Sequence, residues 1–143
     1  MDSMEVRLQR MEDLQEIHQL FTDYGRLLDR RDIDAYAELF ADDGELLLGP
    51  VARAKGRDEI RATMTKVLGA ADSSSFHLVT NADVRLDGDR ATSEVMWTVV
   101  EQAPDGKPVV GAIGRHVDDL VRERGRWRFA RRRGLVDIPT RMV

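Results

Sequence analysis

Apolar positions near the N-terminus recur every three or four residues, and charged residues fill most positions between them. The apolar positions are Leu14, Ile17, Phe21, Tyr24 and Leu28. A period near 3.6 residues is typical of an amphipathic helix, so this pattern predicts a helix over residues 8–29. Asp32 then precedes a second apolar run. Its short carboxylate can cap a helix over residues 33–40.

The next segment mixes turn residues with a short apolar run. The sequence ADDG at residues 41–44 predicts a turn, and the GELLLG run at residues 44–49 predicts a strand that ends before Pro50. A third helix is predicted over residues 58–68, with one apolar face made by Ile60, Met64 and Val67. The sequence GAADSSS at residues 69–75 predicts a loop.

The pattern changes from a helical to a two-residue period in the second half of the chain. Four runs rich in β-forming residues follow one another at 75–86, 90–102, 108–122 and 126–136. The segments DGD, APDGKP and ERGR separate them. Turn residues between alternating runs indicate hairpins, so these runs predict an antiparallel meander.

Helices that come first and strands that come last indicate an α+β fold with the helices on one face of the sheet. The 143 residues suit a single domain, 1–143. We expect a curved, mostly antiparallel sheet of five or six strands around the first helix, with a pocket at the open end.

Composition narrows the possible chemistry. The chain has no cysteine, which excludes disulfides, a thiolate nucleophile and cysteine-ligated metals. Its three histidines have no metal-ligand spacing, and no phosphate-binding or dinucleotide motif is present. We therefore expect neither a metal nor a cofactor. The absence of cysteine suits a reducing compartment, so we expect a cytoplasmic location. No apolar stretch approaches membrane-spanning length, so we expect no membrane partner.

Arginines are concentrated between residues 122 and 133, which raises the question of nucleic-acid binding. The whole chain has a formal net charge of -4, whereas phosphate binders are usually basic. We therefore expect no nucleic-acid partner and interpret these arginines as the solvated face of a hairpin.

An aspartate and a histidine are the candidate reactive pair. His77 opens the first long strand, and strict alternation places it on a mixed face with Val79 and Asn81. Asp29 ends the first helix beside the apolar stripe, where Gly25 leaves room for a ligand. A neutral imidazole is a base near neutral pH, and a carboxylate fixes its tautomer. The alternatives are a sheet histidine without a reactive role and an aspartate that caps the turn after the helix.

His116 lies in the third strand of the meander and faces either the pocket or the outer surface. The other candidate pocket residues are largely apolar: Leu28, Phe40, Val79, Met96, Trp97, Val99 and Ile113. Such a lining suits a hydrophobic, cyclic small molecule.

The segments YGRLLDRRDIDAYAELFADDGEL, FHLVTNADVRLDGDRA and GRHVDDLVRERGRWRFARRR resemble the SnoaL-like branch of the nuclear transport factor 2-like proteins. The resemblance implies a cystatin-like cone and a homodimer or homotrimer formed through the outer sheet face. The pattern of the bile acid 7α-dehydratases and hexachlorocyclohexane dehydrochlorinases implies that Asp29, His77, Tyr24 and Arg132 are catalytic. Ser75 departs from the cysteine of the dehydrochlorinases, and no counterpart of the additional acidic residue of the dehydratases is found.

These features support a cofactor-free lyase or isomerase. His77 would abstract a proton, Asp29 would orient His77, Tyr24 would donate to the reacting oxygen, and Arg132 would stabilise developing negative charge. The alternative is a binding or accessory module of the same fold that does not turn its ligand over. In such a module Asp29 and His77 have no need to meet.

Overall fold

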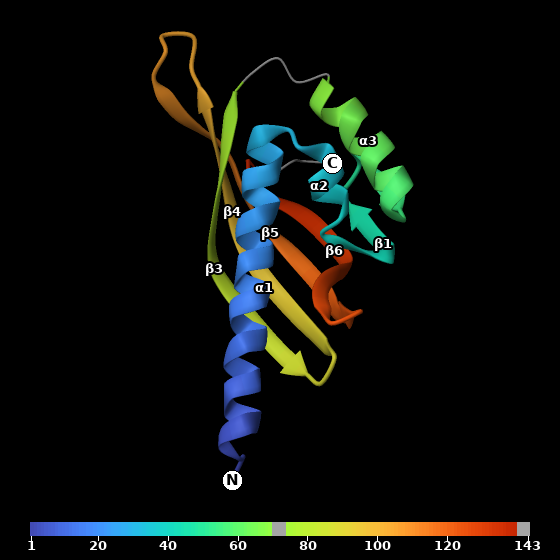
Figure 1. The fold of residues 1–143 in the computed structure, drawn as a ribbon. Coiled ribbons are helices and arrows are strands. Elements are labelled where there is room, and N and C mark those ends of the chain that lie inside the picture. Colours follow the sequence, from blue (N-terminus) through green and yellow to red (C-terminus); the bar gives the residue numbers. More distant parts are fainter. Residues whose placement is uncertain (70–73, 140–143) are drawn as a thin grey trace.

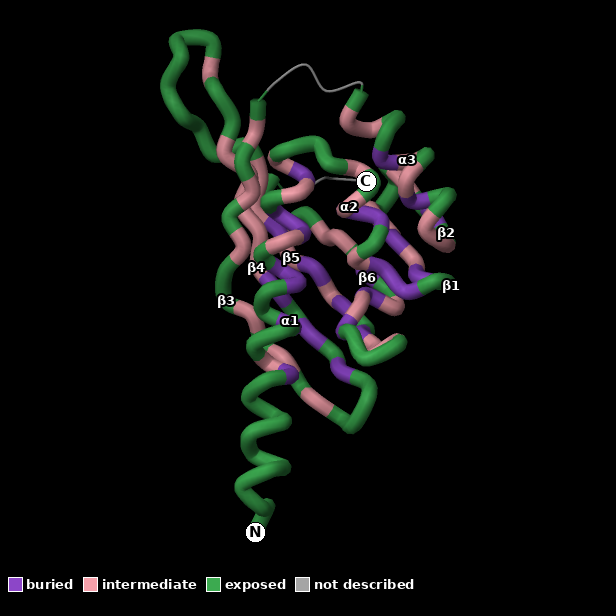
Figure 2. The backbone as a smooth tube through the Cα atoms, viewed as in Figure 1, coloured by how far each residue is buried: buried purple, intermediate pink, exposed green. Residues whose placement is uncertain are grey.

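In the computed structural model, which describes residues 1–69 and 74–139, the first apolar stripe forms helix α1 over Met4–Arg30. The helix begins earlier than the predicted residue 8 because the hydroxyl of Ser3 caps it, accepting a hydrogen bond from a backbone N–H of the first turn. Its first turns are exposed and extend beyond the sheet, as Figure 2 shows.

The end of α1 is set by backbone geometry. Arg31 adopts a left-handed conformation with φ 57°, and its N–H donates back to carbonyls of the last turn. Asp32 then caps helix α2, Ile33–Ala37, as predicted. This helix ends before the predicted residue 40 because Phe40 already belongs to the first strand.

Strand β1 covers Phe40–Leu47, and β2 covers Arg53–Lys55. The predicted turn at residues 41–44 is therefore wrong, because the chain passes through it without reversing. The two acidic residues and the glycine instead form an irregularity between two stretches of β1 that pair with the same neighbouring strand. Helix α3, Arg57–Gly69, follows and agrees with the prediction.

The four strands of the meander are confirmed. They are β3 Ser75–Asp87, β4 Arg90–Gln102, β5 Pro108–Glu123 and β6 Arg126–Ile138. The loop predicted over residues 69–75 includes residues 70–73, which lie outside the described residues.

The six strands form one sheet in the order β2-β1-β6-β5-β4-β3. Neighbouring strands are antiparallel except β1 and β6, which are parallel. Figure 1 shows α1 running along one face of this curved sheet, with α2 and α3 beside its C-terminal half. The predicted α+β architecture, a curved and mostly antiparallel sheet packed on the N-terminal helices, is confirmed.

The core lies between α1 and the inner face of the sheet. At its centre aromatic rings from four elements meet within 4.9–6.2 Å of one another: Phe21, Tyr24, Tyr36, Phe40 and Phe129. All five residues are at most 2% exposed. Burial of side chains this large contributes about 1.5–3 kcal/mol each, so this cluster fixes α1 and α2 on the sheet.

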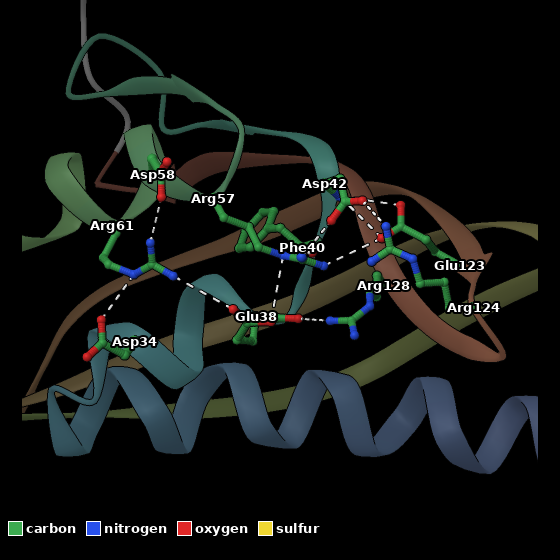
Figure 3. A network of polar contacts seen from close by, with 10 residues as sticks. All are labelled: Asp34, Glu38, Phe40, Asp42, Arg57, Asp58, Arg61, Glu123, Arg124 and Arg128. Carbon is green, nitrogen blue, oxygen red and sulfur yellow. Dashed lines mark hydrogen bonds and ion pairs between the residues drawn. The ribbon is translucent and has the colours of Figure 1, made fainter.

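Ion pairs fix α1 and α3 to the hairpin between β5 and β6. Asp13 of α1 accepts from Arg122 at 2.6 Å and from the indole N–H of Trp127 at 3.0 Å. Figure 3 shows a second network, in which Arg57 of α3 donates to Asp42 at 2.6 Å and to Glu123 at 3.5 Å. Four of the arginines between residues 122 and 133 thus bind the protein's own acids or carbonyl groups: Arg122, Arg124, Arg128 and Arg132.

Candidate active site

A cavity of about 210 Å³ lies where the C-terminal half of α1, helix α3 and the strands β3, β4 and β5 converge. Ten residues line it: Tyr24, Leu28, Leu48, Met64, Val67, Leu68, His77, Trp97, Val99 and His116. Six of these were predicted from the sequence as site residues. Leu48, Met64, Val67 and Leu68 were not, although Met64 and Val67 were placed together on the apolar face of α3.

Asp29 and His77 meet at the edge of this cavity. Oδ1 of Asp29 lies 2.7 Å from Nδ1 of His77, and the backbone N–H of His77 donates to both carboxylate oxygens at 3.0 and 3.2 Å. The carboxylate therefore holds the proton of the neutral imidazole on Nδ1 and leaves the lone pair on Nε2. His77 is the lining residue, and Asp29 reaches the cavity through it.

A close approach of α1 to β3 makes this contact possible. A Cβ at Gly25 would lie 3.2 Å from Cγ2 of Val79 and 3.6 Å from Cβ of His77. The space beside Gly25 is thus filled by the strand, and the prediction that it admits a ligand is wrong. Glycine instead lets the helix approach β3 one turn before Asp29.

Asp29 does not cap the turn after the helix, the alternative left open by the sequence. The backbone of Arg31 closes that turn, and Asp32 caps the next helix. A negative side chain in the last turn of a helix opposes the helix dipole. The three hydrogen-bond contacts with His77 offset this cost.

Strand β3 does not alternate strictly along its whole length. Asn81 has φ 52°, and the pairing with β4 shifts between Thr80 and Asp83. This bulge inserts one residue and reverses the alternation. His77 and Val79 therefore share the inner face with Ala82, and the prediction that His77 shares a face with Asn81 along an unbroken alternation is wrong.

Four predicted pocket residues do not line the cavity. Phe40 belongs to the aromatic core, and Val79 packs against α1 at Gly25. Met96 is adjacent to Trp97 in β4 and therefore lies on the outer face. Ile113 pairs with Thr98, which lies on that same outer face. Met96 cannot share a sheet face with Trp97 when the two are adjacent in one strand.

Two strand glycines make room for the rings of the cavity wall. A Cβ at Gly114 would lie 2.0 Å from the carbonyl of Leu135 and 2.3 Å from the indole of Trp97. A Cβ at Gly134, which pairs with His116, would lie 3.1 Å from Cδ2 of Leu48 and 3.6 Å from the imidazole of His116. Glycine inside a strand signals a close approach, and this signal could have located the cavity wall from the sequence.

The hydroxyl of Tyr24 belongs to a buried chain of polar groups. Tyr36 donates a hydrogen bond to it at 2.9 Å, and the Arg132 guanidinium lies 4.2 Å from the centre of its ring. Burial raises the pKa of Tyr24 above its usual value although Arg132 acts in the opposite direction. Tyr24 is therefore a neutral phenol near neutral pH.

Arg132 is neither on a solvated face nor in the cavity lining. It is 1% exposed, and it donates to Asp118 at 2.8 and 3.1 Å. Ser93 donates to the same carboxylate at 2.9 Å. The guanidinium thus neutralises Asp118 beneath Tyr24. This position differs from the two drawn from the sequence, which were the solvated face of a hairpin and a catalytic place beside the substrate.

His116 lines the cavity, which decides between the two positions left open for it. Its ring lies 5.1 Å from that of Tyr24 and 6.0 Å from that of Trp97. Burial lowers the pKa of His116 well below its usual value, and the positive charge of Arg132 acts in the same direction. His116 is therefore a neutral imidazole near neutral pH.

This lowered pKa predicts a loss of stability in mild acid. The unfolded chain binds a proton at His116 near pH 6.5, whereas the folded chain binds it only at lower pH. The free energy of unfolding should thus fall as the pH decreases below about 6.5, by up to about 1.4 kcal/mol per unit. Urea unfolding between pH 7.5 and 5 should show a shallower dependence for His116→Phe, and His18→Gln is the surface control. An unchanged slope in His116→Phe would contradict this origin.

In the described part of the chain, no group of three metal-ligating side chains comes together. The described helices also include none long and apolar enough to cross a membrane.

A model of the SnoaL-like domain matches residues 9–133. An uncharacterized protein of Mycobacterium tuberculosis is 30% identical over 134 residues, which cover 92% of this chain and 90% of that protein. An NTF2-like protein with a cystatin-like fold from Novosphingobium aromaticivorans is 29% identical, with a TM-score of 0.85 over 98% of this chain and 94% of that one. A scytalone dehydratase-like protein from the same organism is 21% identical, with a TM-score of 0.77 over 90% and 87%, and shares the fold alone.

Proposed function

The chain belongs to the SnoaL-like domain family, and from this premise we propose that it is a cofactor-free lyase or isomerase acting on a hydrophobic, cyclic small molecule. The observation that carries the proposal is the 2.7 Å contact between Asp29 and His77 at the edge of an apolar cavity. A carboxylate, an imidazole and a neutral phenol suffice for proton transfer without a metal or cofactor.

His77 is the base in this proposal. Its Nε2 takes a proton from a substrate carbon, and Asp29 stabilises the imidazolium that forms. Tyr24 donates to the oxygen that gains negative charge. We assign Arg132 a positioning role, since it contacts the ring of Tyr24 and is paired with Asp118.

Hydrogen–deuterium exchange tests this function directly. Cyclic ketones and β-hydroxy ketones incubated with the protein in D₂O should gain deuterium at the carbon next to the carbonyl, or lose water, faster than without protein. His77→Ala should slow this reaction at least about 10²-fold, the contribution of a general base. His18→Gln, on the exposed face of α1, is the matched histidine control and should retain the wild-type rate.

The competing function is a binding or accessory module. Saturable binding of these compounds without exchange or elimination, in the wild-type chain, would assign this second function and overturn the first. Equal rates in wild type and His77→Ala would remove His77 from the mechanism.

Self-association as a homodimer or homotrimer remains part of the proposal. Several apolar side chains of β3, β5 and β6 are exposed: Phe76, Leu78, Val109, Val110, Val136 and Ile138. Contiguous exposed apolar surface marks an interaction site. A solution mass from light scattering checks this, and a monomer at micromolar concentration would contradict it.

A further inference from the structure

The first turns of α1 extend past the sheet into solvent. Residues 4–12, here called the α1 overhang, are all exposed, and Figure 2 shows them beyond the body of the molecule. Three large apolar side chains of the overhang form what we call the seam: Met4 at 74% exposure, Leu8 at 53% and Met11 at 67%. Helical segments this short are marginal in water unless an apolar face packs against something. The overhang therefore indicates a partner for the seam.

The seam points away from the protein's own sheet. Successive residues of a helix are about 100° apart, so the three seam residues fall within about 60° of one another. The core stripe of α1, centred between Leu20 and Tyr24, lies about 180° from them. Val6, the other large apolar residue of the overhang, faces the body of the protein and lines a hollow there with Leu86. The described part of the chain thus has nothing of its own to cover the seam.

The spacing of the seam suits a second helix. Its residues are four and then three positions apart, which is the heptad spacing by which two helices pack side by side. The same face of α1 stays exposed as far as Arg26, so no side chain of the described residues blocks an approaching helix. Beyond Met11 this face is polar, with Gln15, His18 and Thr22. The apolar contact is therefore confined to the overhang.

The charges beside the seam favour one orientation of the partner. Glu5 and Glu12 flank the seam on one side, and Arg7 flanks it on the other. Two parallel copies of this helix bring the acidic flank of each against the basic flank of the other, with Arg7 opposite Glu12 of the second copy. Antiparallel copies would bring like charges together. Within the described residues, neither Arg7 nor Glu12 has an ion pair of its own, so both are available.

A membrane surface fits this stripe less well than a second copy does. Helices that lie on membranes have polar faces rich in lysine and arginine, which attract anionic lipids. Here one flank is acidic, and the whole chain has a formal net charge of -4. Both features oppose binding to an anionic surface, whereas the two flanks of the seam complement each other.

We propose that the α1 overhang is a docking surface for a second copy of this chain, with the two seams packed in parallel and in register. Two pairs between Arg7 and Glu12, one on each side, then complete the contact. This surface is separate from the exposed apolar residues of β3, β5 and β6, so the inference goes beyond the self-association proposed above. A contact this small is weak alone, and it adds to any other contact by raising the effective concentration.

Site-specific crosslinking tests the register. The chain has no cysteine, so Met4→Cys introduces a single thiol on the seam. Two such thiols face each other in the parallel pair, and oxidation should crosslink them at least tenfold faster than the thiols of Gln9→Cys, which face the body. Equal rates in the two variants would overturn the proposal. So would preferential crosslinking between Met4→Cys and Met11→Cys chains, since antiparallel helices place residue 4 opposite residue 11. These positions are exposed, so the fold should be unaffected.

Charge reversal tests the orientation in the Met4→Cys background. Arg7→Glu and Glu12→Arg each convert two attractive pairs into repulsive ones and should slow crosslinking at least tenfold at low salt. Arg10→Glu is the matched control, because Arg10 pairs with Asp2 away from the seam, and it should keep the parent rate. An equimolar mixture of the two reversed chains regains opposite charges on both sides. It should crosslink near the parent rate as a heterodimer identified by mass, and parent rates in both single reversals would overturn the assignment.

Two further measurements separate this contact from its alternatives. Binding of the wild-type chain to phosphatidylcholine–phosphatidylglycerol vesicles, with no preference for crosslinking at residue 4 over residue 9, would assign the stripe to a membrane and overturn the proposal. Leu78→Glu disrupts the apolar surface of the sheet and should leave the preference for residue 4 unchanged. A preference lost in Leu78→Glu would show that the overhang has no contact of its own.

Discussion

Arg132→Ala is expected to lower the free energy of unfolding by about 3–5 kcal/mol, the usual loss when one member of a buried ion pair is removed. Asp118 is fully buried, and its carboxylate accepts both bonds from this guanidinium. Without Arg132 the carboxylate keeps the hydrogen bond from the hydroxyl of Ser93. The variant also loses the cation that lies 4.1 Å from the ring of Phe129 and 4.2 Å from that of Tyr24.

Chemical denaturation at pH 7 measures this effect. Arg131→Ala is the matched control, since Arg131 is the exposed neighbour on the other face of β6 and should change stability by less than about 0.5 kcal/mol. Arg132→Met combined with Asp118→Leu should recover most of the loss, because no unpaired charge remains. Equal stability of the two alanine variants would show that the buried pair does not support the fold.

This prediction alters how activity data on Arg132 should be interpreted. Lower turnover in Arg132→Ala would follow from a displaced Tyr24 or from partial unfolding, without any contact between Arg132 and substrate. The position of Arg132 beneath the cavity could not be predicted from the sequence. Alternation in β6 gives the face of residue 132, but its partner Asp118 lies on the neighbouring strand.

The meander was predictable because its signals are local. Two-residue periods and Asp-Gly or Arg-Gly turns determine β3 to β6, and their observed ends differ from the predicted ones by at most two residues. The first strand was less predictable. The sequence ADDG is typical of a turn, yet tertiary pairing with β6 keeps it extended with an irregularity.

Site residues could be predicted from the sequence where a residue conflicts with a local structural preference. They could not be predicted where a β-bulge reverses the alternation of a strand. Asp29 opposes the helix dipole, and such local conflicts are expected at functional positions. By contrast, the bulge at Asn81 depends on pairing with β4, and the cavity face of Trp97 depends on Gly114 in another strand. Met96 was misassigned for a different reason, since alternation within β4 already excludes it from the face of Trp97.

Asp29→Asn and His77→Ala provide the second large effect, on the rate of proton transfer. Each variant should lower kcat/KM by about 10²–10⁴-fold, because both the base and the charge that supports it are needed. Asparagine keeps the shape of the side chain. It loses the charge that stabilises the imidazolium, and its amide no longer favours Nδ1 protonation over the other tautomer.

The double variant distinguishes a dyad from two separate groups. If Asp29 acts only through His77 across their 2.7 Å contact, the double variant is no slower than the slower single variant. Independent groups would instead multiply their losses. Asp23→Asn, at another aspartate of α1, controls for general effects of the substitution on the helix.

Asp29 also accepts a hydrogen bond from the backbone N–H of His77, so Asp29→Asn can displace strand β3 as well. Unchanged binding of a cyclic ketone in this variant would show that the cavity persists, and the lost rate would then measure the charge of Asp29 acting on the His77 imidazolium.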